Sequence, residues 1–268
     1  YNIIRLELPK EGENPYACAR DILKMWQDKG ILKIEDKPAI YIYEEEFSVG
    51  NTRKSIKGII ARVQLEEFSK GIILPHEFTL SKAKEDRLNL MKATNCNFSQ
   101  IYALYMDEKH TTLATIDEQS KAKADLEFTD ETGVTHRLWI ETDEEIIAKL
   151  VADFADRKLY IADGHHRYET ALNYRNYCRE NGISKPGDPQ DFQMIYLVDM
   201  EHPGLVVFPT HRLVRDLPNF DKEAVLEKCS EFFYIDEKEG TDTMEEDLKK
   251  LYDEGKKAFG FYCGKGEW

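Results

Sequence analysis

One segment near residue 160 constrains the fold of this chain more than any other. Residues 159–162 are apolar, Asp163-Gly164 is a strong turn signal, and residues 165–180 follow a helical period. The apolar face of that period carries Tyr168, Ala171 and Leu172. Apolar residues at this spacing hold a helix against a core, so the segment predicts a buried strand, a sharp turn and a packed helix.

The rest of the chain also alternates between helical and strand-like segments. Helices are expected at residues 15–30, 81–94, 144–154, 222–229 and 244–252, with Asn14 and Ser81 as caps of the first two. Strands are expected at residues 3–8, 39–43, 56–65, 101–106, 195–198, 205–208, 232–235 and 258–263, with a Gly50-Asn51 turn joining the second and third. This alternation predicts an α/β (α+β) fold with a mixed sheet and flanking helices.

A length of 268 residues allows one large domain or two modest ones. We expect an N-terminal α/β portion at 1–107, a polar connecting segment at 108–145 and a C-terminal α/β portion at 146–268, with one continuous domain as the alternative. Gly133 separates two short strand candidates in the connecting segment. Because the chain opens without Met and stops inside a strand-like run, we expect it to be a fragment.

Composition excludes several classes of function. The formal net charge of −14 disfavours nucleic acid as a partner, but a local cluster of donors can still hold a small phosphorylated ligand. No run of about 18 apolar residues is present, so no membrane span is expected. The five cysteines form no CxxC pair, which indicates free thiols in a reducing, cytoplasmic compartment. The sequence leaves the number of subunits open.

Polar side chains gather where the predicted helix begins. The first turn of a helix presents unpaired N–H groups and the positive end of its dipole, so phosphate or carboxylate is a natural ligand there. His165, His166 and Arg167 project from that turn, and a guanidinium can bind an anion through two hydrogen bonds. Asp163 precedes the turn, where it could hold Mg²⁺ beside a phosphate or accept a proton from a hydroxyl. A purely structural role for Asp163 as the helix cap stays open, and the segment lacks the GxxxxGK[ST] pattern of a Walker A loop.

Residues 160–172, YIADGHHRYETAL, resemble the hallmark of the bacterial and archaeal domain-of-unknown-function family 1015. Other stretches that fit the family are residues 1–9 with 14–16, 74–77 with Thr79, 86–88, and 209–213, so the resemblance covers nearly the whole chain. The central motif is similar to the phosphate-binding turn of the ParB and sulfiredoxin superfamily. Members of that superfamily include CTP-dependent clamps, an ATP-dependent sulfinate reductase and free-serine kinases.

The resemblance implies roles for individual residues. Those that would hold nucleotide phosphates are Gly164, His165, His166 and Arg167. Asp163 would lie beside the reacting group. The kinases of the superfamily use a Glu from another loop as general base, and Glu77 is the candidate here.

Two further clusters could join this site. In the first, His76 and Glu77 share a loop, and Arg87 on the following helix could meet a phosphate. In the second, His211 and Arg212 could bring another imidazole and guanidinium to the same pocket. The structural alternative is hydrogen bonding to neighbouring backbone and a solvated Asp86–Arg87 pair for the first cluster, and capping of a strand end for the second.

Three functions stay open at this point. The first is a phosphotransferase that uses ATP or ADP with Mg²⁺ on a small hydroxyl metabolite such as an amino acid, with Asp163, His165 and Glu77 as catalytic residues. The second is a non-catalytic nucleotide-binding regulatory module built on the same turn. The third is a metal-dependent hydrolase whose ligands would be His76, His165, His166 and His211. Adjacent helical residues point about 100° apart, which disfavours the two neighbouring histidines as ligands of one ion.

Overall fold

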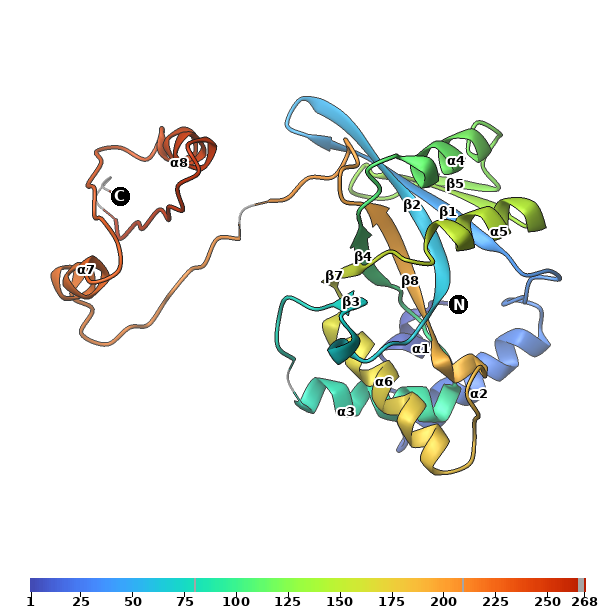
Figure 1. Cartoon of the computed structure of the whole chain (residues 1–268). Helices are drawn as coiled ribbons and strands as arrows, with labels where there is room; N and C mark the ends of the chain where they lie inside the picture. The colour runs from blue at the N-terminus through green and yellow to red at the C-terminus, as the bar shows by residue number, and fades with distance from the viewer. Residues whose placement is uncertain (80, 209, 265–267) are drawn as a thin grey trace. The chain divides into compact units, whose positions relative to one another are not determined.

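The computed structural model describes residues 1–79, 81–208, 210–264 and 268, with side chains for all of these except residues 81–83. The chain divides into two units, Tyr1–Val207 and Phe208–Trp268 (Figure 1). The smaller unit contains two helices, α7 (Lys222–Ser230) and α8 (Met244–Asp253), as the sequence predicts. The larger unit contains every strand that is described.

The larger unit is built on one eight-stranded sheet in the order β3-β7-β4-β8-β2-β1-β6-β5. Its strands are β1 (Ile40–Val49), β2 (Thr52–Gln64), β3 (Ile73–Leu74), β4 (Ile101–Tyr105), β5 (Leu126–Thr129), β6 (Thr135–Glu141), β7 (Leu159–Asp163) and β8 (Phe192–Asp199). β3 runs parallel to β7 and β4 parallel to β8, and the other neighbouring pairs are antiparallel. This confirms the predicted α+β class with a mixed sheet.

The larger unit also contains several helices. They are α1 (Ile4–Glu7), α2 (Pro15–Asp28), α3 (Ser81–Thr94), α4 (Thr111–Gln119), α5 (Glu144–Asp153) and α6 (His165–Glu180), with short 3-10 turns at Phe68–Lys70 and Pro189–Asp191. The main core joins α4, α5 and α6 to the strands through buried Ile116, Leu150 and Tyr168. Ile195 and Leu197 of β8 belong to that core. Tyr196 and Val198 of the same strand belong to a second cluster, because successive residues of a strand face opposite sides of the sheet.

Several local predictions are confirmed. Asn14 caps α2, because its Oδ1 accepts a hydrogen bond from the Ala17 N–H at 3.1 Å, and Pro15 occupies the first helical position. β1 and β2 form the expected hairpin around Gly50. α3 begins at Ser81, whose proposed capping side chain lies outside the described side chains.

The prediction of a strand at residues 3–8 is wrong, since this segment contains the single helical turn α1. Asn2 Oδ1 accepts the Ile4 N–H at 3.0 Å, which favours the turn. Leu6 is fully buried against Leu23 and Trp26 of α2, while the apolar residues on either side of it are largely exposed. The alternation in the sequence therefore reflects one anchoring side chain and not a sheet face.

The structure also differs from the predictions at three expected strands and at one helix. Residues 205–208, 232–235 and 258–263 form no strand in the part of the chain that is described. Helix α4 was not predicted, because its sequence is rich in Thr, a poor helix former, and its N-cap residue His110 has a left-handed φ of 50°. Packing of Thr112, Thr115 and Ile116 against the core stabilises it instead.

Residues 108–145, which we expected to connect two portions, contribute α4, β5 and β6 to the larger unit. Their strands extend the same sheet that contains β1 and β7, and Gly133 lies in the turn between them. The boundary between the two units falls after Val207. Within the described residues, no helix is both long enough and apolar enough to cross a membrane.

Candidate functional site

The turn between β7 and α6 has the backbone geometry that the sequence predicts. Gly164 adopts a φ of 95°, in the left-handed region that favours glycine, and precedes the first residue of α6. A Cβ at this position would lie 2.9 Å from Nε of Arg167, so the guanidinium packs directly over the glycine. Gly164 is the N-cap residue of α6, and no side-chain hydrogen bond from this position caps the helix start.

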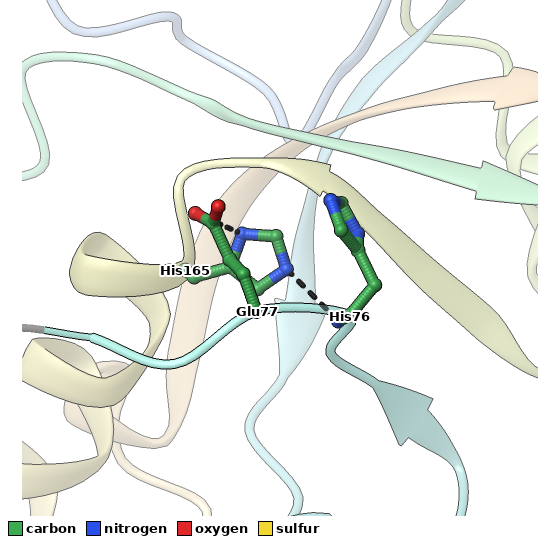
Figure 2. Close-up of side chains that lie close together, drawn as sticks. All are labelled: His76, Glu77 and His165. Carbon is green, nitrogen blue, oxygen red and sulfur yellow. Dashed lines mark hydrogen bonds and ion pairs between the residues drawn. The ribbon is translucent and has the colours of Figure 1, made fainter. Parts of the chain in front are cut away.

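A loop that comes 89 residues earlier in the sequence, counted from His76 to His165, lies against this turn. β3 pairs in parallel with the start of β7, with Ile73 opposite Leu159, so the residues after β3 run alongside the end of β7. His76 Nδ1 lies 2.8 Å from the Ile161 carbonyl oxygen, and its backbone N–H donates to His165 Nε2 at 3.2 Å. Figure 2 shows the Glu77 carboxylate turned toward the other ring nitrogen of His165.

His165 is the buried centre of this cluster, with 1% of its surface exposed. Its Nδ1 lies 3.1 Å from Glu77 Oε1, within ion-pair distance, yet makes no hydrogen bond of acceptable direction to any described residue. Its Nε2 accepts from the His76 amide, so in the neutral ring the proton is on Nδ1. Burial lowers the pKa of His165 below its ordinary 6.5, while the nearby carboxylate of Glu77 opposes that shift.

The same loop is fastened a second time, one helical turn further along α6. Thr79 Oγ1 donates to Glu169 Oε2 at 2.7 Å, and Lys84 Nζ on α3 donates to the same oxygen at 2.6 Å. Phe78, between the two fastened positions, is completely exposed. The side chains of Glu77 and Thr79 therefore point toward α6, and the side chain of Phe78 between them points into solvent.

Arg167 lies on the other side of the helix start. Its Nη1 donates to the Gln100 carbonyl oxygen at 2.6 Å, and its Nη2 pairs with the Asp163 carboxylate. Arg87 makes a similar set of contacts, pairing with Asp86 and donating to the Glu7 carbonyl oxygen at 2.6 Å. Both arginines line one cavity of about 40 Å³ between α3, residues 96–99 and α6, which has room for little more than a water molecule.

The structure thus brings together most of the residues that the sequence singled out. Those gathered around the start of α6 are His76, Glu77, Asp163, Gly164, His165, His166 and Arg167, and Arg87 shares a cavity with the last of them. His211 and Arg212 are exposed and belong to the smaller unit. Pro209, which belongs to the same sequence motif, lies outside the described residues.

Sequence reasoning missed the residues that hold the site together. Glu169 and Lys84 clamp the loop, and the carbonyls of Ile161 and Gln100 orient His76 and Arg167. Glu169 is four residues after His165, on the same helix face, and this spacing was a detectable signal. The carbonyl contacts depend on strand pairing and leave no trace in the sequence.

Among the residues described, one ligand atom from each of His76, Glu77 and His165 lies within 4.8 Å of the other two. No curated protein and no solved structure matches this chain. A protein-family model described as "Protein of unknown function (DUF1015)" matches residues 1–268. The strand–turn–helix segment that carries the predicted site lies inside this match, and the chain belongs to the DUF1015 family.

Proposed function

We propose that this protein is a nucleotide-dependent phosphotransferase that acts on a small hydroxyl metabolite, with an amino acid as one candidate. The observation that carries the proposal is the position of Glu77. Its carboxylate comes from a loop 88 residues before His165 in sequence, yet it lies 3.1 Å from that residue's ring at the start of α6. A helix start, where an anion is favoured, with a partly exposed carboxylate beside it suits the phosphorylation of a hydroxyl group.

The reaction would use each group of the site in a distinct role. The Glu77 carboxylate accepts the proton of the acceptor hydroxyl, whose oxygen then forms a bond to the γ-phosphorus of ATP. The bond from that phosphorus to the β,γ-bridging oxygen breaks, and ADP leaves with the electron pair. The positive end of the α6 helix dipole and the Arg167 guanidinium attract phosphate oxygens and offset their negative charge.

Asp163 is the side chain that fits Mg²⁺. Its carboxylate is 74% exposed at the end of β7, and Mg²⁺ in nucleotide sites takes one or two carboxylates together with phosphate oxygens. When bound, Mg²⁺ neutralises phosphate charge. Asp163 pairs with Arg167 in the described structure, so a bound metal and phosphate would exchange that pair for two new ones.

We place the activity in the cytoplasm, an assignment supported by five free cysteines. The turn and loop equally suit the ParB and sulfiredoxin type of phosphate site, in which a glycine precedes the anion-binding helix.

Thermal unfolding with ATP, ADP, CTP and tripolyphosphate, each with and without Mg²⁺, tests the binding half of the proposal. A ligand at a hundred times its dissociation constant adds about 2.7 kcal/mol of stability. We expect this stabilisation in the wild type and its loss in Arg167→Ala. Arg179→Ala is the matched control, because Arg179 is on the same helix and pairs with Asp191 away from the turn. Equal stabilisation in all three proteins would place the nucleotide elsewhere.

Product analysis tests the catalytic half. Wild-type protein should form ADP from ATP only when a hydroxyl acceptor is present, and Glu77→Gln should keep the nucleotide-induced stabilisation but lose turnover. Nucleotide that binds and stays intact for hours with every acceptor would identify the protein as a regulatory nucleotide-binding module instead.

A further inference from the structure

We propose that His76, Glu77 and His165 form a binding site for a divalent transition-metal ion of the zinc type. The inference rests on these three side chains and not on the proposed phosphotransferase. Two imidazoles and one carboxylate are a recurrent ligand set for zinc, and three protein ligands leave an open position for water or a phosphate oxygen.

The first argument is the unusual contact between His165 and Glu77. Nδ1 of His165 is buried and lacks a hydrogen bond to the described residues, although a carboxylate oxygen lies only 3.1 Å away. Two ligands bound to one tetrahedral ion at about 2.1 Å each are about 3.4 Å apart. The pair therefore has the separation of two ligands of one metal without the direction of a hydrogen bond.

The second argument is the orientation of His76. A carbonyl oxygen can only accept a hydrogen bond, so His76 Nδ1 carries a proton and donates a hydrogen bond of 2.8 Å to the Ile161 carbonyl oxygen. The neutral ring then carries a lone pair on Nε2. Histidines that bind metals usually donate their second ring N–H to a carboxylate or a carbonyl in this way, which fixes both tautomer and ring orientation.

The third argument is proximity. Ligand atoms of all three residues lie within 4.8 Å of one another, and the rings of His76 and His165 meet edge to face at 4.5 Å between centroids (Figure 2). His76 and Glu77 are exposed and adjacent in one loop, so an adjustment of that loop would bring the three atoms to bonding distance of one ion.

Metal binding would have one structural consequence that can be measured. When Nδ1 of His165 donates its lone pair to a metal, the ring proton moves to Nε2, which can no longer accept the His76 amide. The metal therefore replaces the 3.2 Å hydrogen bond that now holds the loop. It also makes Glu77 a ligand in place of a base, so zinc and phosphotransfer would compete for this residue.

Calorimetric titration of the metal-stripped full chain with Zn²⁺, without nucleotide, tests the site. We expect one ion per chain in the wild type, and loss of more than about tenfold in affinity in both His76→Ala and Glu77→Gln. Because both residues are exposed, neither change should prevent folding. Phe78→Ala is the matched control, since Phe78 is in the same loop and fully exposed. His110→Ala controls for a half-exposed histidine near the carboxylates of Asp199 and Glu201.

Three results would overturn the inference: no stoichiometric zinc binding, unchanged affinity in His76→Ala, or loss of binding in His110→Ala. Hydrogen exchange gives an independent readout, because the His76 amide should exchange faster once zinc is bound, and unchanged exchange at full occupancy would exclude Nδ1 of His165 as a ligand. Zinc binding that fails while ATP still stabilises the chain would refute this site alone. If zinc binds but no nucleotide stabilises the chain, the zinc site is supported and the proposed phosphotransferase function is refuted.

Discussion

His165 shows how one residue couples burial to the chemistry of its neighbours. A histidine with 1% of its surface exposed must be neutral or have a partner for its charge, and the exposed Glu77 offers only a misdirected contact. The pKa of His165 is consequently lowered from 6.5, with burial as the main cause. The native state therefore favours the neutral ring.

This shift predicts a pH dependence of stability. The unfolded chain binds a proton at His165 below about pH 6.5, whereas the folded chain resists it, so the free energy of unfolding should fall as pH drops from 6.5 toward the lower folded pKa. Urea unfolding between pH 5.5 and pH 7.5 measures the slope. His165→Gln should reduce this slope. The part of the slope that remains is expected from His202, whose pKa is also lowered by burial. An unchanged slope in His165→Gln would contradict the assignment.

Tyr168 supports a second prediction at the residue scale. Its buried hydroxyl donates to the Glu66 carbonyl oxygen at 2.8 Å and accepts from the Glu66 N–H at 2.9 Å, tying α6 to the segment after β2. Tyr168→Phe leaves both backbone groups without this partner and should cost about 1–3 kcal/mol in urea unfolding. Tyr177→Phe on the same helix, whose hydroxyl has no hydrogen-bond partner among the described residues, should change stability by less than about 0.5 kcal/mol. Similar losses in the two variants would contradict the argument.

At the scale of elements, β7, the Gly164 turn and α6 were predictable because each depends on neighbours in sequence. An apolar run, a glycine and a helical period are enough to define them. The position of the loop carrying His76 and Glu77 was not predictable, because it depends on the two-residue parallel pairing of β3 with β7. Two residues give no recognisable strand pattern, and the partner strand is more than 80 residues away.

The Gly164 turn supports a prediction with a close control. Gly164 and Gly182 flank α6, and both have positive φ, 95° and 67°. Alanine in the left-handed region costs about 1–2 kcal/mol, so both Gly→Ala variants should lose roughly that much in urea unfolding. A Cβ at Gly164 would also meet the Arg167 guanidinium, whereas the space around Gly182 is open within 4 Å. Gly164→Ala should therefore be the less stable variant, and equal losses would show that Arg167 moves away without cost.

At the scale of the whole molecule, the two units differ in what they contribute. The main core, the sheet and the ligand atoms of His76, Glu77 and His165 all belong to Tyr1–Val207. His211 and Arg212 belong to Phe208–Trp268, where large apolar side chains such as Phe232 and Tyr234 are exposed. Removal of the smaller unit therefore keeps the clustered site residues and deletes His211 and Arg212, which the sequence analysis assigned to the same pocket.

A chain ending at Val207 should fold, because the contacts that bury its core lie within residues 1–207. We expect a single cooperative thermal transition and zinc affinity within about threefold of the full chain, since the three ligands and the clamp by Thr79, Glu169 and Lys84 are retained.

Nucleotide binding then decides the role of the smaller unit. If the shortened chain binds ATP as tightly as the full chain, His211 and Arg212 lie outside the nucleotide site. If the shortened chain loses ATP binding, and the double variant His211→Ala/Arg212→Ala of the full chain loses it too, these two side chains contribute to nucleotide binding. A shortened chain that binds neither zinc nor ATP while folded would contradict the placement of both sites in the larger unit.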